Sequence, residues 1–148
     1  MPALIALGRV LFSVLFVVSG AFKLMDLAST TQMTEKIVLP AAFASYTAQL
    51  ESVTGMPMAQ MLAIAAGAIE LLCGLMIALN FGARFAAVVL ILFVAAATFY
   101  FHDFWNQTGA DARNNLVQSL KNLSIIGALL IVAGTTRLVP LAKPAYDV

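Results

Sequence analysis

The stretch that decides the fold is MAQMLAIAAGAIELLCGLMIALNFGARFAAVVLILFVAAATFYF, residues 58–101. It contains two apolar runs, Met58–Leu79 and Arg84–Phe101, separated by a short polar turn with a glycine at Asn80–Ala83. An α-helix needs about 20 residues to cross the hydrocarbon of a bilayer, and both runs are close to that length. Because the turn is so short, the two helices must be antiparallel neighbours, and the stretch predicts a transmembrane helical hairpin.

Two further apolar segments lie outside this hairpin, at Ala3–Met25 and Leu116–Thr136. Unpartnered backbone groups cost several kcal/mol each in lipid, which restricts membrane spans to helices and closed barrels. The alternating pattern of barrel strands is absent. The sequence therefore predicts an all-α membrane protein, a four-transmembrane-helix bundle that forms one domain over residues 1–148. We expect the first span to be retained, because its apolar run is longer than the core of a signal peptide.

The composition agrees with a lipid environment. The 148 residues are 62% hydrophobic and 10% charged, with a mean hydropathy of +0.98, and a soluble domain of this size could not bury so much apolar surface. The formal net charge of +1 gives no signal for nucleic acid. One cysteine and one histidine predict no metal site. The sequence also lacks a phosphate-binding glycine loop and a nucleophile-elbow serine.

The connections and their charges suggest an orientation. The long connection Asp26–Pro57 contains a stretch, Ala41–Val53, that is expected to form a short surface helix, and the second long connection is His102–Asn115. Positive charge collects on the cytoplasmic side of membrane proteins. We therefore predict that both termini are cytoplasmic and that 26–57 is an extracytoplasmic loop. The side with the termini would hold Arg9, Arg84, Arg137 and Lys143, and the other side Lys23, Lys36 and Arg113.

Glu70 lies near the middle of the second predicted span. A carboxylate at that depth costs roughly 2.5–3.5 kcal/mol on insertion scales, and such residues usually face the protein interior. Ala63, Gly67, Glu70 and Gly74 are spaced by four, three and four residues, which places them on one helical face. Small residues allow helices to approach closely in membranes. Glu70 is therefore expected on a packing face, directed away from lipid.

The first span has a matching face, and we predict that Arg9 on this face pairs with Glu70. Two interpretations of such a pair are open. It could be a structural ion pair that fixes helix register, or Glu70 could handle protons or face a ligand. The residues of the matching face are Arg9, Ser13, Phe16, Gly20 and Lys23.

An aromatic segment closes the third span. Tyr100, Phe104 and Trp105 are typical of the aromatic belt at a membrane interface. That interpretation leaves His102, the only histidine, and Asp103 unexplained. We predict that His102, Asp103 and Lys121 form one polar patch beneath the outer surface, together with Lys23. The alternative is a snorkelling lysine and a capped helix end. On the fourth span, Gln118, Lys121 and Ser124 share a face.

These residues together resemble the DoxX family of bacterial membrane proteins over nearly the whole chain. The resemblance is carried by Gly8-Arg9, Ser19-Gly20 with Lys23-Leu24, Glu70 with Gly74-Leu75, Phe101-His102-Asp103-Phe104-Trp105, and Lys121-Asn122-Leu123. It implies a four-helix inner-membrane protein. Some relatives are subunits of thiosulfate:quinone oxidoreductase, and others join membrane complexes linked to oxidative-stress defence and thiol redox balance. Carried over by position, the polar residues would be Arg9, Glu70, His102, Asp103 and Lys121.

Three functions follow as hypotheses. The first is an oxidoreductase subunit that acts with a partner: the bundle would bind a quinone or lipid-like molecule, and Glu70 or His102 would exchange protons with it. The second is a non-enzymatic scaffold or accessory subunit of a larger membrane complex, or a homo-oligomer. The third is a small transporter. The candidate catalytic residues are Glu70, His102 and Asp103, and the predicted intramembrane polar network is Arg9, Lys23, Glu70 and Lys121.

Overall fold

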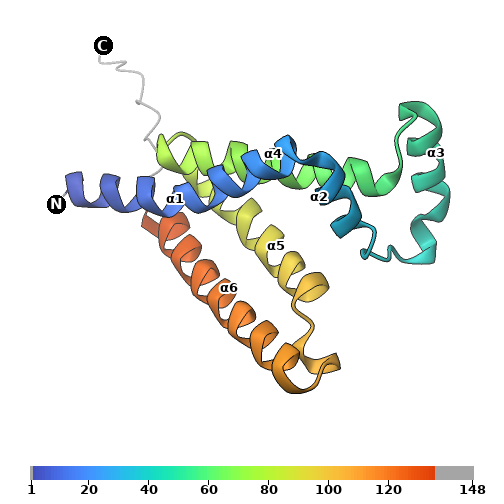
Figure 1. The fold of residues 1–148 in the computed structure, drawn as a ribbon. Coiled ribbons are helices and arrows are strands. Elements are labelled where there is room, and N and C mark those ends of the chain that lie inside the picture. The colour runs from blue at the N-terminus through green and yellow to red at the C-terminus, as the bar shows by residue number, and fades with distance from the viewer. Residues whose placement is uncertain (1, 136–148) are drawn as a thin grey trace, which may run out of the picture.

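The computed structural model describes residues 2–135 and contains four long helices (Figure 1). All four are long and apolar enough to cross a membrane, and the described residues contain no strand. The prediction of an all-α protein with four spans is therefore confirmed. The long helices are α1 (Pro2–Met25), α4 (Met58–Ala78), α5 (Ala83–Phe101) and α6 (Gly109–Thr135). The connections contain α2 (Leu27–Thr34), η1 (Ala41–Phe43), α3 (Ala44–Thr54) and η2 (Phe104–Asn106).

The four spans form two pairs that meet at one end. Helix α1 runs alongside α4, α5 runs alongside α6, and the pairs diverge from the tight turn between α4 and α5 (Figure 1). In that turn Asn80 and Gly82 have positive φ angles of 56° and 58°, which suit a glycine and an asparagine. A shared core fills the end where the pairs meet. It consists of Phe16 from α1, Cys73 and Ile77 from α4, Ala83, Ala86, Ala87, Leu90 and Val94 from α5, and Leu129 from α6.

Helices α1 and α4 pack with their backbones close together. A Cβ atom added at Gly20 would lie 2.5 Å from the backbone nitrogen of Leu71 and 2.6 Å from the carbonyl oxygen of Gly67. At Gly74 it would meet Val17 and Phe16 at 3.0 Å. The glycines therefore permit a helix approach that any larger residue would prevent. This contact also places Gly20 opposite Leu71 and Val17 opposite Gly74, which makes the two helices antiparallel.

The long connection contains two short helices. Asp26 caps the N-terminus of helix α2, and its side chain accepts a hydrogen bond from the Ser29 amide at 3.1 Å. Helix α2 packs along the first turns of α4, where the Thr34 hydroxyl donates to the carbonyl of Ala59 at 2.6 Å. Helices η1 and α3 cover the stretch that was expected to form a surface helix, and none of their residues is buried.

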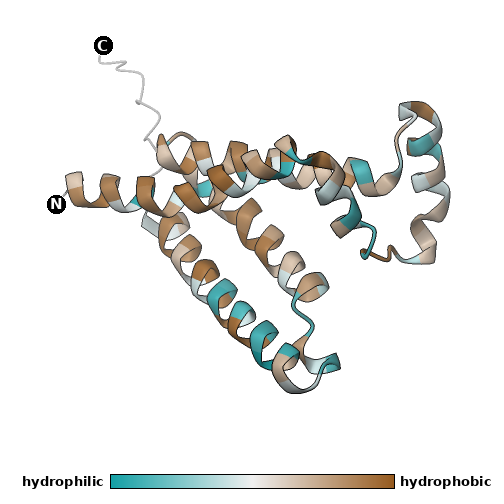
Figure 2. Ribbon diagram, in the orientation of Figure 1, coloured by the Kyte–Doolittle hydropathy of each residue, from teal (hydrophilic) through white to brown (hydrophobic). Residues whose placement is uncertain are grey.

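Helix α6 begins well before the predicted start at Leu116. Its first two turns are polar, as the teal colour near the α5–α6 connection shows (Figure 2). A hydropathy pattern cannot find such a beginning, because these residues need no apolar surroundings. Asp111 in the first turn suits the positive end of the helix dipole. The predicted end of this span at Thr136 lies outside the described residues, as do Arg137 and Lys143.

Candidate functional site

Glu70 is buried on the packing face of α4. Its exposed fraction is 6%, and Ala63, Gly67 and Gly74 on the same face are also buried. The prediction that this face packs against protein and not lipid is confirmed. The matching face of α1 supplies Ser13, Phe16 and Gly20, which are buried against it.

The partners of Glu70 are two residues near the end of α1. Lys23 Nζ lies 2.6 Å from Glu70 Oε2, and the Ser19 hydroxyl donates to the same oxygen at 2.8 Å. Lys23 also donates to Ser19 Oγ at 2.6 Å. We call Ser19, Lys23 and Glu70 the Glu70 cluster. Opposite charges and a hydroxyl neutralise the carboxylate inside the helix pair, so the cost of placing it there is offset within the protein.

The predicted Arg9–Glu70 pair is wrong. Because Gly20 lies opposite Leu71, the level of Glu70 on α1 is close to Gly20, and Arg9 is three helical turns, about 16 Å, nearer the N-terminus. Arg9 is thus level with the α4–α5 turn. Its Nε atom is buried and has no hydrogen-bond partner among the described residues. Lys23, which was placed in the outer patch, takes the position expected for Arg9.

The second polar group is a chain of side chains at the far end of the α5–α6 pair. His102 Nδ1 lies 3.0 Å from Asn115 Oδ1. Asn115 Nδ2 donates to Gln107 Oε1 at 2.6 Å, and Gln107 Nε2 donates to Asp103 Oδ1 at 2.7 Å. We call these four residues the His102 chain. All four are half-buried, so the chain joins the histidine to the carboxylate along a path partly shielded from water.

Two more hydrogen bonds join α5 to α6 beside this chain. The Ser119 hydroxyl, which donates to the carbonyl of Asn115 at 2.8 Å, also lies 3.2 Å from the carbonyl oxygen of His102, and Asn122 Nδ2 donates to Thr98 Oγ1 at 2.9 Å. Asn115, Ser119 and Asn122 are spaced by four and three residues, so they form one face of α6. Sequence reasoning missed this face, although its spacing was a usable signal, and chose instead the neighbouring face that contains Lys121.

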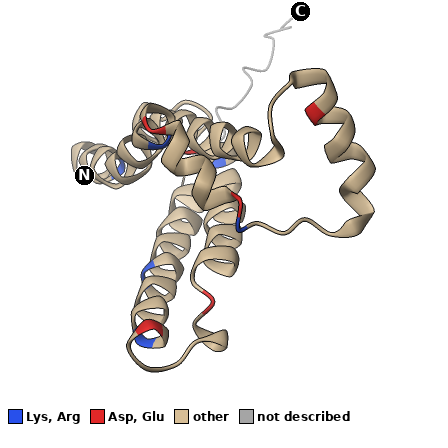
Figure 3. Cartoon of the chain, turned by 45° about the vertical axis from the view of Figure 1, so that its right-hand side comes forward, with Lys and Arg blue, Asp and Glu red and all other residues tan. Residues whose placement is uncertain are grey.

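The structure does not form the predicted patch of His102, Asp103, Lys121 and Lys23. Among the described residues, the side chains of His102 and Asp103 are connected through those of Asn115 and Gln107, and Lys23 belongs to the Glu70 cluster on the other helix pair. Lys121 is exposed, and it has neither a salt bridge nor a side-chain hydrogen bond to the part of the chain that the structure describes. Figure 3 shows how sparse charged residues are along the long helices.

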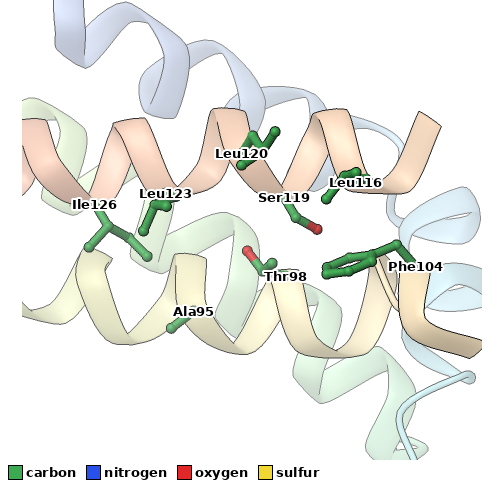
Figure 4. Close-up of a pocket in the computed structure, with 8 residues that line it drawn as sticks. All are labelled: Ala95, Thr98, Phe104, Leu116, Ser119, Leu120, Leu123 and Ile126. Atoms are coloured by element: carbon green, nitrogen blue, oxygen red, sulfur yellow. The ribbon is translucent and has the colours of Figure 1, made fainter. Parts of the chain in front are cut away.

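An apolar pocket lies between α5 and α6, next to the His102 chain. Its volume is about 400 Å³, within the range of small-molecule sites. Figure 4 shows side chains from both helices around it, closed at one end by the ring of Phe104. The hydroxyls of Thr98 and Ser119 are the polar groups among its lining side chains. The lining residues are Ala95, Thr98, Phe104, Leu116, Ser119, Leu120, Leu123 and Ile126.

The aromatic residues of this end have different surroundings. Trp105 is half exposed, and its ring lies 5.1 Å from that of Phe104 and 5.8 Å from that of Phe99. Tyr100 is also exposed. Exposure of Tyr100 and Trp105 agrees with an interfacial position, whereas Phe104 lines the pocket.

Residues 2–135 contain no group of three or more His, Cys, Asp or Glu side chains that could hold a metal ion. The contacts within the two polar groups are hydrogen bonds and the Lys23–Glu70 ion pair. The Glu70 cluster can hold a carboxylate at a helix interface, and the His102 chain can fix the orientation of an imidazole.

Comparison with known proteins places the chain in a family. The DoxX family model matches residues 4–103, which include all three members of the Glu70 cluster as well as His102 and Asp103. The inner membrane protein YphA of Escherichia coli (strain K12) is 30% identical over 134 residues, which are 90% of this chain and 84% of that protein. No solved structure matches the chain significantly. The relative and the four apolar helices support a multi-pass protein of the inner membrane. The chain thus belongs to the DoxX family.

Proposed function

We propose that this DoxX-family protein is the membrane subunit of a redox system and that it holds a quinone, or a ring molecule of similar lipid-like chemistry, in the α5–α6 pocket. The observation that carries the proposal is the position of the pocket. It is apolar, it lies between two membrane spans, and it adjoins the His102 chain. We place both termini in the cytoplasm, as the positive charges favour.

The pocket suits the shape and polarity of a quinone. Leucine and isoleucine side chains from α6 and Ala95 from α5 would contact an apolar ring and its tail. Phe104 would offer a ring face for stacking. The hydroxyls of Thr98 and Ser119 donate to the backbone carbonyls of Val94 and Asn115, so the ring would be held by apolar contacts and stacking. A pocket open toward the lipid would let such a molecule enter from the bilayer.

The His102 chain supplies what quinone chemistry needs at such a place. Reducing a quinone to a quinol consumes two electrons and two protons. His102 is the single histidine, and an imidazole can both accept and donate a proton, so it is the group we assign to passing protons from water to the quinone oxygens. Electrons come from a partner subunit that carries a flavin, haem or iron–sulfur group.

A second role, as an accessory subunit, is favoured by the surface of α6. Only 6% of the most apolar window of this helix is buried, and Gln118, Lys121 and Ser124 on one of its faces are exposed. Charged residues inside membrane spans usually face protein. We therefore expect the electron-donating partner to pack on this face of α6. Migration of the native protein as a lone small species would count against that partner.

Filling the pocket is expected to abolish quinone binding. In Ala95→Phe the new ring occupies the space between α5 and α6, and the affinity for a benzoquinone with one isoprenoid unit should fall at least tenfold. Binding is followed by the fluorescence of Trp105, the single tryptophan. Its ring packs against Phe104 of the pocket wall, so a bound quinone quenches its emission. Ala96→Phe is the matched control, because Ala96 is the next residue of α5, exposed and outside the pocket.

The wild-type protein and the Ala96→Phe control should show the same saturable quenching. If the wild-type protein in mild detergent shows no saturable quenching, the pocket does not bind quinone. If Ala95→Phe and Ala96→Phe weaken binding equally, the quinone binds elsewhere.

A further inference from the structure

The His102 chain has a direction that is set by its charged end. An ionised carboxylate can only accept hydrogen bonds, so Gln107 must present its NH₂ group to Asp103 Oδ1. The Gln107 oxygen then faces Asn115 and accepts from Asn115 Nδ2. Asn115 therefore turns its own oxygen toward His102. Each amide is oriented by the one before it, and the carboxylate orients the first.

The last step of this chain decides which ring nitrogen of His102 carries the proton. Asn115 Oδ1 is an acceptor, so His102 Nδ1, at 3.0 Å, must be the donor. In the neutral imidazole one nitrogen bears a hydrogen and the other is an acceptor. His102 Nε2 is then the nitrogen that bears the lone pair.

We propose that Asp103 is a positioning residue that holds neutral His102 in the Nδ1-protonated tautomer through Gln107 and Asn115, so that Nε2 is the nitrogen that exchanges protons. Only the claim that Nε2 exchanges protons with a bound molecule rests on the proposed function. The His102 chain sets the tautomer whether or not a ligand binds.

The carboxylate has a second contact that agrees with its acceptor role. Asn106 Nδ2 approaches Asp103 Oδ2 at 3.5 Å, so amide donors face both oxygens. If Asp103 gained a proton, it could donate to Gln107. Both amides could then turn over and offer a donor to Nδ1, which would favour the Nε2-protonated tautomer. The direction of the chain thus links the charge of Asp103 to the tautomer of His102.

The single histidine makes this arrangement measurable. Protein grown with ¹⁵N-labelled histidine gives one pair of ring-nitrogen signals, which belong to His102. The spectra are recorded in lipid nanodiscs at a pH raised until the two ring-nitrogen signals are those of a neutral imidazole. The nitrogen coupled to both ring carbon-bound protons is Nε2. We expect it to be the unprotonated one, and Nδ1 to carry the hydrogen.

Two variants test whether Asp103 acts on His102 through the hydrogen bonds of the His102 chain. In Asp103→Asn the end of the chain can donate or accept, so its direction is lost, and the ratio of Nε2-protonated to Nδ1-protonated ring should rise at least tenfold. Gln107→Leu keeps the charge of Asp103 but removes the two hydrogen bonds that Gln107 makes in the His102 chain. It should raise the ratio of Nε2-protonated to Nδ1-protonated ring in the same way. Asp111→Asn is the control: it removes an exposed carboxylate from the first turn of α6 and should leave the tautomer unchanged.

The proposal is overturned if the wild-type ring is protonated at Nε2, a result that needs no variant to fold. It is also overturned if Asp103→Asn or Gln107→Leu, with wild-type helix content, keeps the wild-type tautomer. An Nδ1-protonated wild-type ring in a protein that binds no quinone would refute the proposed function and leave this assignment intact.

Discussion

Replacing Lys23 with methionine is expected to lower the free energy of unfolding by about 3 kcal/mol, because the Glu70 carboxylate would lose its counter-charge inside the helix pair. The side chain of Glu70 is only 8% exposed, and its Oε2 atom accepts from Lys23 at 2.6 Å. The hydroxyl of Ser19 would remain as a partner, but it brings no charge. Reversible unfolding in mixed detergent micelles, followed by circular dichroism, measures the difference.

A second lysine provides the control for this experiment. Lys36 is exposed and its side chain has no ion pair in the described structure, so Lys36→Met should change the free energy of unfolding by less than about 0.5 kcal/mol. The double variant Lys23→Met with Glu70→Gln removes both charges. It should be more stable than the sum of the two single variants predicts, by at least about 1 kcal/mol. Strictly additive effects would show that the two side chains do not stabilise each other.

Adding one methyl group at Gly20 is expected to destabilise the α1–α4 pair by about 2–3 kcal/mol. The new Cβ would lie 2.5 Å from the Leu71 nitrogen and 2.6 Å from the Gly67 oxygen. Both are backbone atoms that cannot move without shifting a helix. Alanine is the better helix former by about 1 kcal/mol, so the loss must come from the contact. Thermal unfolding of Gly20→Ala in detergent tests this.

The matched control is Gly127→Ala in α6. A Cβ at Gly127 would have no atom within 4 Å outside its own helix, so only the helix propensity changes, and the variant should be as stable as the wild-type protein or slightly more stable. Equal stability of the two alanine variants would contradict the close packing of α1 against α4.

The length of the apolar runs was enough to find the four spans, and the spacing of small residues was enough to find the buried face of α4. The apolar runs are long, and the glycines at 67 and 74 fall on the same side as Glu70, so both the four spans and the inward position of this carboxylate could be predicted. The residue that neutralises Glu70 could not. Arg9 and Lys23 lie on the same face of α1, and only the glycine contacts at Gly20 and Gly74 determine which of them comes level with it.

The outer polar group shows a similar limit. His102 and Asp103 stood out because an aromatic belt does not explain a histidine beside a carboxylate, whereas Gln107 and Asn115, which connect them, are uncharged residues of a polar connection. Lys121 drew attention for its charge, yet the face of α6 that contacts α5 is the one with Asn115, Ser119 and Asn122. Charge alone shows which residues are costly in lipid, but hydrogen-bond partners depend on helix rotation.

Photolabelling with an azido-quinone in native membranes tests directly whether a quinone occupies the pocket between α5 and α6. We predict that the label attaches to peptides covering 95–126 and that an excess of unlabelled quinone prevents the attachment. Labelling confined to α1 and α4, or labelling that unlabelled quinone does not reduce, would contradict the assignment of the pocket.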